Sequence, residues 1–144
     1  MKKAIVCLAV ALAIPTSVAF AKSPHTNSGT HGKSNPMVMY VLKGTLSALT
    51  PASGTTDGSV TITVTHANVH AKALKNGAPL TFQVASNTRI TFANGSPTTT
   101  LAPNAKGMVK FRAPLRVTLT NGATLATTLP TMAKAFHVIV QKNG

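Results

Sequence analysis

Strict alternation of apolar and polar residues is the feature that most constrains how this chain can fold. In "SVTITVT" (Ser59–Thr65), valine and isoleucine occupy every second position and serine or threonine the positions between them. A two-residue period of this kind is typical of a β-strand with one buried face, and β-branched residues favour it further. No stretch repeats its apolar residues at helical spacing over three turns, so the pattern predicts an all-β fold.

Other short runs have the same rhythm and are divided by turn residues such as Asn-Gly, Gly and Pro. Gly44 lies inside the first run, where a glycine predicts a bulge or a sharp bend. The segment Leu115–Leu129 predicts a hairpin around Asn121 and Gly122, and Thr131–Lys134 at most one helical turn. The other predicted strands cover residues 38–49, 59–65, 80–85, 88–92, 108–113 and 135–142.

About six short strands with almost no helix need an arrangement that hides their edges. A small closed or partly open OB-like barrel satisfies this requirement, and a two-sheet sandwich is the alternative. The inward faces of the strands would carry the apolar residues of each alternating run. Those predicted to face inward include Val38, Tyr40, Leu42, Val60, Ile62, Val64, Leu80, Phe82, Val84, Val109, Phe111, Phe136, Val138 and Val140.

The first residues have the features of an export signal. Lys2 and Lys3 precede an apolar run from Ala4 to Ile14, and "AFA" ending at Ala21 fits a small-x-small cleavage site. We therefore expect a signal peptide over residues 1–21, a flexible polar leader over 22–36 and a single β-barrel domain over 37–144. The expected location is secreted, extracellular or in the cell envelope, with no membrane-spanning segment in the mature chain.

The mature chain is expected to be strongly basic. The sequence has 14 Lys and Arg against one acid, Asp57, and loss of Lys2 and Lys3 lowers the net charge from +13 to about +11. The counter-charges must come from salt or from an anionic partner such as nucleic acid, cell-wall polymer or lipid headgroups, unless the charge serves only solubility. Asp57 lies in a predicted turn, where its expected role is to hydrogen-bond its own backbone.

Two groups of basic residues are candidate anion-binding sites. The first is Lys110, Arg112 and Arg116, of which the first two share the outward face of one strand. The second is Lys72, Lys75 and Arg89. Because most aromatic residues are assigned to core faces, no platform for base stacking is expected, and attraction to nucleic acid would be non-specific.

The composition excludes several kinds of active site. Paired-carboxylate chemistry needs two acids, and the only cysteine, Cys7, lies in the signal peptide. A Ser-His-acid triad would have to use Asp57, and no glycine-rich phosphate loop is present. We therefore expect a non-enzymatic protein with no cofactor.

The spacing of His66 and His70 raises the question of a metal site. On one extended strand, four residues would place them about 13 Å apart, which is too far for one metal ion. They would converge only in a helical turn, and zinc would still need a further ligand such as His137, His25 or His31. We therefore treat His66 and His70 as weak metal candidates and expect both to be solvent-facing residues at a strand end.

The order of these segments resembles domain-of-unknown-function family 5666, a group of exported bacterial β-barrels. The matching pieces are "LKGTLS" (Leu42–Ser47), "GSVTITV" (Gly58–Val64), "GAPLTFQV" (Gly77–Val84), "NTRITF" (Asn87–Phe92), "KGMVKFRA" (Lys106–Ala113) and "AKAFHVIV" (Ala133–Val140). The likeness covers most of residues 42–140 and departs from the family pattern between Pro114 and Met132. It implies a fold and an exported location, and it implies no activity.

Together these features predict a secreted, non-enzymatic β-barrel module that adheres electrostatically to anionic polymers or to a cell surface. Two alternatives remain at this stage: a barrel that carries a small apolar ligand, and weak metal binding by the histidines.

Overall fold

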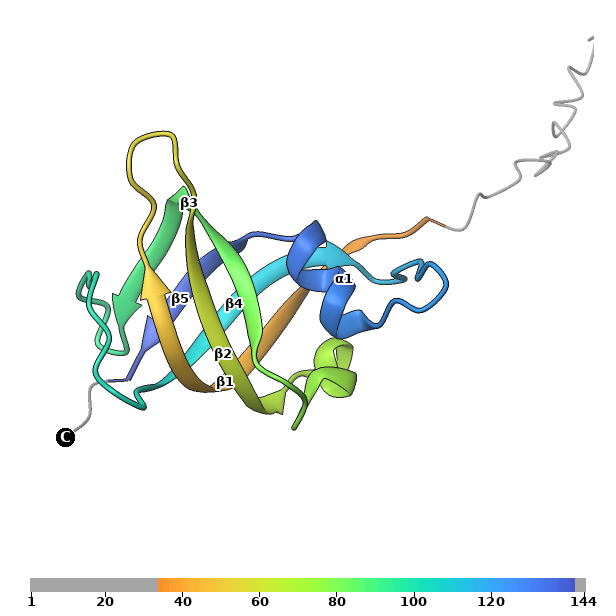
Figure 1. Cartoon of the computed structure of the whole chain (residues 1–144), viewed down its shortest axis with the longest axis horizontal. Helices are drawn as coiled ribbons and strands as arrows, with labels where there is room; N and C mark the ends of the chain where they lie inside the picture. Colours follow the sequence, from red (N-terminus) through yellow and green to blue (C-terminus); the bar gives the residue numbers. More distant parts are fainter. Residues whose placement is uncertain (1–33, 142–144) are drawn as a thin grey trace, which may run out of the picture. The chain divides into compact units, whose positions relative to one another are not determined.

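The computed structural model describes residues 34–141, which form five strands, one 3₁₀ helix and one α-helix (Figure 1). In chain order these are β1 (Met37–Thr50), β2 (Gly58–Ala67), η1 (Val69–Leu74), β3 (Leu80–Phe92), β4 (Lys106–Pro114), α1 (Leu125–Met132) and β5 (Ala135–Val140). The proposed signal peptide and most of the leader lie outside the described residues.

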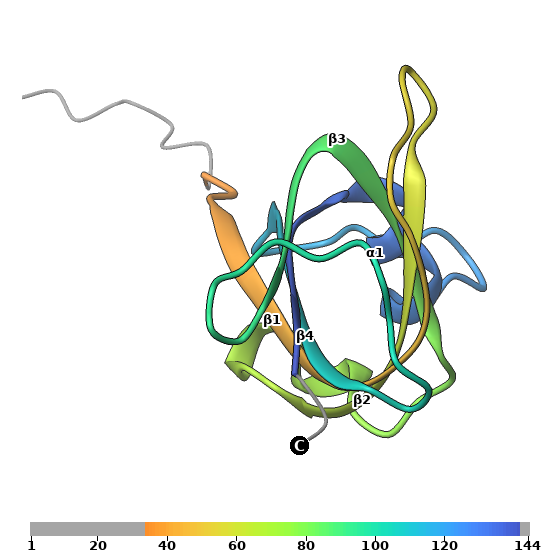
Figure 2. The ribbon, with the colours of Figure 1, turned by 90° about the vertical axis from the view of Figure 1, so that its left-hand side faces the viewer.

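The five strands close into one ring in the order β1-β2-β3-β5-β4, with β4 paired back to β1 (Figure 2). All neighbours are antiparallel except β3 and β5, which run parallel. The all-β prediction is confirmed, whereas the two-sheet alternative is wrong because the sheet is a single closed one. The expected six strands become five because residues 80–85 and 88–92 belong to the one strand β3.

The alternating residues fill the centre of the ring as predicted for most strands. Val60, Ile62 and Val64 on β2 are buried between polar threonines. The rings of Phe82 and Phe111 lie 4.6 Å apart, and Phe111 also stacks on Tyr40 at 5.0 Å. Aromatic pairs at these distances stabilise a core beyond the burial of their surface. The core is therefore made by side chains from every strand of the ring.

At Gly44 the strand β1 comes close to the backbone of β2. The register between the two strands shifts by one residue between Lys43 and Gly44 and leaves Thr65 of β2 unmatched. An irregularity is therefore present at Gly44 as predicted, but its extra residue belongs to the partner strand. A Cβ atom at Gly44 would overlap the carbonyl oxygen of Thr63 on β2. Only glycine permits this approach, which lets β1 pair with β2 on one edge and with β4 on the other.

The predicted hairpin in residues 115–129 is wrong, because this segment ends in the helix α1. Asn121 and Gly122 do form a turn, with Gly122 at a φ of 79°, but no second strand follows. Instead Thr124 and Thr127 form a reciprocal capping box that begins α1, and Leu129 is fully buried. The single helical turn expected at residues 131–134 is wrong for the same reason, since α1 already ends at Met132.

Phe136 was predicted to face the core, and the structure contradicts this. Lys110 is in register with His137, whereas Phe111 is in register with Ala135, so Phe136 is the unmatched residue of a bulge. Its side chain is 39% exposed, while Val138 and Val140 are buried as predicted. The extra residue breaks the two-residue period, which is why alternation alone misplaced it.

We expect Gly44→Ala to lower the free energy of unfolding by more than about 2 kcal/mol, because the new methyl group must displace the backbone of β2. Gly77→Ala is the matched control, since its Cβ would be 3.7 Å from the carbonyl oxygen of Leu74, an ordinary contact. It should change stability by less than about 0.5 kcal/mol. Urea denaturation measures both, and equal effects would contradict the close approach at Gly44.

Candidate functional site

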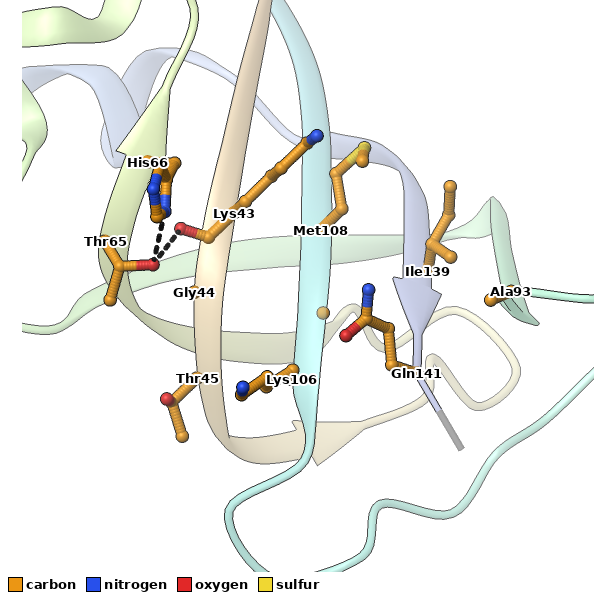
Figure 3. A pocket seen from close by; sticks show the side chains of 11 residues that line it. Lys43, Gly44, Thr45, Thr65, His66, Ala93, Lys106, Met108, Ile139 and Gln141 are labelled. Carbon is orange, nitrogen blue, oxygen red and sulfur yellow. Dashed lines mark hydrogen bonds between the residues drawn. The ribbon is translucent and has the colours of Figure 1, made fainter. Parts of the chain in front are cut away.

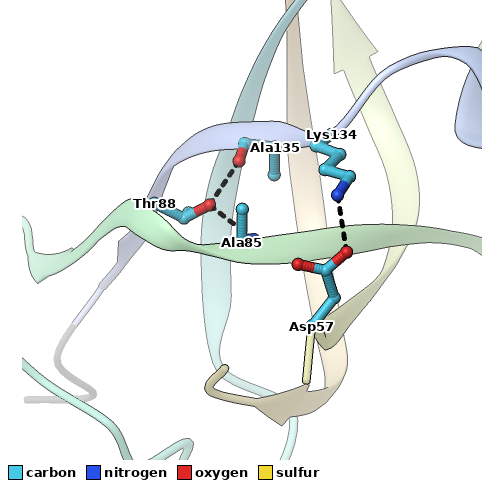
Figure 4. Close-up of polar contacts among 5 residues, drawn as sticks. All are labelled: Asp57, Ala85, Thr88, Lys134 and Ala135. Atoms are coloured by element: carbon cyan, nitrogen blue, oxygen red, sulfur yellow. Dashed lines mark hydrogen bonds and ion pairs between the residues drawn. The ribbon is translucent and has the colours of Figure 1, made fainter. Parts of the chain in front are cut away.

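The one acidic residue of the chain forms an ion pair. The Nζ atom of Lys134 donates to Oδ2 of Asp57 at 2.6 Å, and both side chains are partly exposed (Figure 4). The role expected for Asp57, bonding to its own backbone, is thus replaced by a link from the β1–β2 connection to the residue before β5. Because Asp57 is the sole acidic residue, the other Lys and Arg have no Asp or Glu to pair with.

A hydroxyl group holds β5 against an irregular part of β3 beside this ion pair (Figure 4). The Thr88 hydroxyl donates to the carbonyl oxygen of Ala135 at 2.6 Å and accepts from the backbone N–H of Ala85 at 2.9 Å. The register between β3 and β5 shifts here, between Val84 and Arg89. Thr88 therefore bridges the gap in the ladder and sets where Arg89 resumes the pairing.

Closure of the ring places three basic side chains in one row across three strands. Arg89 on β3 is in register with His137 on β5, and His137 is in register with Lys110 on β4. Residues directly opposite each other on neighbouring strands have side chains close enough to interact. The Nε2 atom of His137 is also 3.2 Å from the hydroxyl oxygen of Thr91. We call Arg89, Lys110 and Arg112, together with His137, the basic row.

The electrostatics of His137 reflect this crowding of positive charge. Burial lowers the pKa of His137 below its ordinary value of 6.5, and the charges of Lys110 and then Arg89 lower it further. A neighbouring carboxylate would have the opposite effect on the pKa of an imidazole. The surface around His137 is therefore cationic at neutral pH even with the imidazole uncharged.

Arg112 extends the row along β4. It is exposed, lies two residues from Lys110 on the same strand, and is in register with Met39 on β1. Met39 is 41% exposed and Phe136 39% exposed, so this part of the surface presents apolar as well as cationic groups. Phe136 is at the surface because of the bulge in β5, which the alternation of the sequence does not reveal.

Arg116 lies beyond the end of β4, where the end of the leader is bound to it. The Asn35 side chain accepts from the Arg116 backbone N–H at 2.7 Å and donates to its carbonyl oxygen at 2.6 Å. The backbone N–H of Leu115 donates to the carbonyl oxygen of Pro36 at 2.9 Å. The last residues assigned to the leader are thus paired with the barrel, and the Arg116 side chain is exposed.

The second predicted cluster is divided in the structure. Lys72 and Lys75 are exposed on and just after η1, which packs against β1, β2 and α1. Arg89 is instead in register with His137 on β5 and belongs to the basic row. The sequence could not give this grouping, because it depends on the parallel pairing of β3 with β5.

His66 and His70 lie on different elements. His66 is exposed near the end of β2, as expected, and its Nδ1 atom is 3.1 Å from the hydroxyl oxygen of Thr65. His70 is exposed but lies in η1 rather than on a strand, with its ring centroid 6.1 Å from that of Tyr40. Within residues 34–141, no three His, Cys, Asp or Glu side chains come together as metal ligands. His25 and His31 lie outside this range.

The interior of the ring and its outer surface offer different opportunities for binding. The centre is occupied by fully buried side chains such as Phe82, Phe111 and Leu42, so an apolar ligand there would have to displace them.

The outer surface carries a groove of about 610 Å³ beside Gly44 and Gly107, which was not predicted from the sequence (Figure 3). Lys43 and Lys106 line this groove, and neither was among the predicted site residues.

Comparisons with protein-family models, with characterised proteins and with solved structures found no match for this chain. Among the residues that the structure describes, no helix has the length and apolar character needed to cross a membrane.

We expect the free energy of unfolding to decrease as the pH falls below about 6.5, because the lowered pKa keeps His137 neutral in the folded state while the unfolded chain binds a proton. The contribution of His137 to the free energy of unfolding is fully present above that pH. It is lost as the pH falls towards the lower pKa of His137 in the folded state. Urea denaturation near pH 7.5 and near pH 5 measures it, with His137→Gln as the comparison. An identical pH dependence in both proteins would contradict the account of His137.

Proposed function

We propose that this chain is an exported, non-enzymatic β-barrel module that adheres to anionic polymers or to an anionic cell surface. The observation that carries the proposal is the basic row, in which Arg89, His137 and Lys110 are side by side with no carboxylate among them. Basic side chains held close together without internal partners favour the binding of external anions, which relieves their mutual repulsion.

The side chains of the basic row favour non-specific electrostatic binding of an anionic polymer over recognition of a particular nucleotide or sugar sequence. Its cations come from several strands, so they can follow a chain of phosphate, sulfate or carboxylate groups across the barrel. Binding of this kind is driven largely by the release of counterions and weakens steeply with salt. The exposed residues Met39, which is in register with Arg112, and Phe136, which precedes His137 on β5, would add apolar contact with the body of the polymer.

We also propose that the fold is an OB-like barrel of the kind described for domain-of-unknown-function family 5666. The strand order and the closure of β1 on β4 support this, because OB-folds are five-stranded barrels. The pieces that carry the resemblance fall largely on strands, with "LKGTLS" spanning the bulge at Gly44. The segment that departs from the family pattern, Pro114 to Met132, is the one that contains α1.

The proposed export rests on the sequence. Residues 1–21 have the charge, apolar run and cleavage site of a signal peptide, and the remainder contains no cysteine. An envelope location would bring the basic row to anionic polymers outside the cytoplasm.

The test is retention of the protein on immobilised heparin and on DNA over a salt gradient. The double variant Lys110→Glu with Arg112→Glu should elute at much lower salt, because it reverses two charges of the basic row. The slope of log affinity against log salt should fall in magnitude by about 1 to 2 for two lost contacts.

The charge-matched control is Lys72→Glu with Lys75→Glu, which changes the net charge equally on and beside η1. It should elute near the original protein if the basic row is the adhesion site. If both variants lost retention equally, net charge and not the basic row would account for the binding. Retention that did not change with salt concentration would contradict the electrostatic basis of the proposal.

A further inference from the structure

The outer groove of about 610 Å³ is a second surface feature, made by residues other than those of the basic row (Figure 3). It lies where β1 and β4 run side by side, with β2 on one side and the end of β5 on the other. Its volume is within the range of small-molecule sites, so it can take more than a single inorganic ion. Its lining includes Lys43, His66, Lys106, Met108, Ile139 and Gln141.

Two lysines line the groove from neighbouring strands. Lys43 on β1 is in register with Met108 on β4, and Lys106 lies two residues before Met108 on that strand. Such diagonal neighbours are about 7 to 8 Å apart, which long side chains can span. In Figure 3 the Lys43 side chain extends across β4 beside Met108 and the Lys106 side chain extends towards Thr45, so a shared anion requires a rotamer change in at least one of them.

Other polar side chains stand on either side of the lysines. Gln141 neighbours Lys106, because its backbone N–H donates to the Lys106 carbonyl oxygen at 2.8 Å, and its side-chain amide lines the groove. His66 is in register with Lys43 on the opposite side. The Thr65 hydroxyl donates to the Lys43 carbonyl oxygen at 3.3 Å, and the Nδ1 atom of His66 lies 3.1 Å from the oxygen of the same hydroxyl.

The number of cations favours a phosphate over a carboxylate. Two lysines and no acid are among the lining residues of the groove. A phosphate monoester carries about −1.5 to −2 charge at neutral pH and three strong acceptor oxygens, and lysine binds it as a point charge. A carboxylate would bring a single charge to the two lysines.

The groove also has an apolar wall. Met108 and Ile139 are half-buried neighbours on β4 and β5, in register with each other, and both line the groove beside the lysines. An inorganic ion would leave this wall uncovered, whereas an ester would lay its organic part against it. Apolar contact of this kind stabilises a complex in proportion to the surface removed from water.

We propose that this groove binds an organic phosphate ester, with the phosphate between Lys43 and Lys106 and the organic part against Met108 and Ile139. The inference goes beyond adhesion through the basic row and does not depend on it, because the two sites share none of these residues.

The experiment is a titration of the isotope-labelled full chain followed by NMR, with phenyl phosphate, inorganic phosphate and benzyl alcohol as separate probes. Phenyl phosphate should bind most tightly and shift the backbone amide signals of Gly44, Gly107 and Met108. Lys43→Gln with Lys106→Gln should weaken its binding about tenfold. Lys72→Gln with Lys75→Gln, the matched control, should leave its binding unchanged.

The results that would overturn the proposal are equally specific. Equal affinity for phenyl phosphate and inorganic phosphate, or for phenyl phosphate and benzyl alcohol, would contradict the assigned ligand class. Shifts centred on the basic row would contradict the location. Heparin retention of the Lys43 and Lys106 variant should remain closer to the original than that of the Lys110 and Arg112 variant, so failure of one proposal is distinguishable from failure of the other.

A competition step identifies the source of the ester. Displacement of phenyl phosphate by phosphatidylglycerol vesicles would support the site and assign it to a lipid headgroup. Displacement by glycerol 3-phosphate alone would support the site and assign it to a soluble ester. Displacement by neither would overturn the proposed ligand class.

Discussion

The pairing of β1 along both of its edges is the constraint on which the rest of the structure depends. One strand must meet β2 on one edge and β4 on the other, so it has to bend where its register with β2 shifts. Gly44 allows this because its missing side chain leaves room for the Thr63 carbonyl group. Closure then removes the exposed strand edges that an open sheet would present, since only a complete ring has none.

Closure also decides which charges become neighbours. Arg89, Lys110 and His137 are far apart in the sequence, and they meet only because β5 inserts between β3 and β4. The one acid, Asp57, is engaged by Lys134. The same closed sheet therefore serves two purposes, because its inside supplies the apolar core and its outside gathers cations that have no acidic side chain beside them.

Much of the fold could be predicted from the two-residue period, and the failures have physical causes. Val60, Ile62 and Val64 were placed correctly because nothing interrupts the alternation between Gly58 and Val64. Phe136 was misplaced because a bulge adds one residue, and a bulge is a property of the pairing between two strands. The helix α1 was missed because its threonines favour strands, whereas the capping box at Thr124 and the burial of Leu129 favour a helix. Within the candidate site, Lys110 and Arg112 could be grouped from the sequence because they alternate along one strand. Arg89 could not be added to them, because its position depends on the parallel pairing of β3 with β5.

The central claim is the register that brings β3, β5 and β4 together, and cross-strand nuclear Overhauser effects in solution test it most directly. The account predicts contacts between the backbone protons of Arg89 and His137, and between those of His137 and Lys110. It also predicts no contacts between the backbone protons of β3 and those of β4, because β5 lies between these two strands. A spectrum in which β3 contacted β4 directly, or in which β5 paired with neither, would contradict the closed ring and the basic row together.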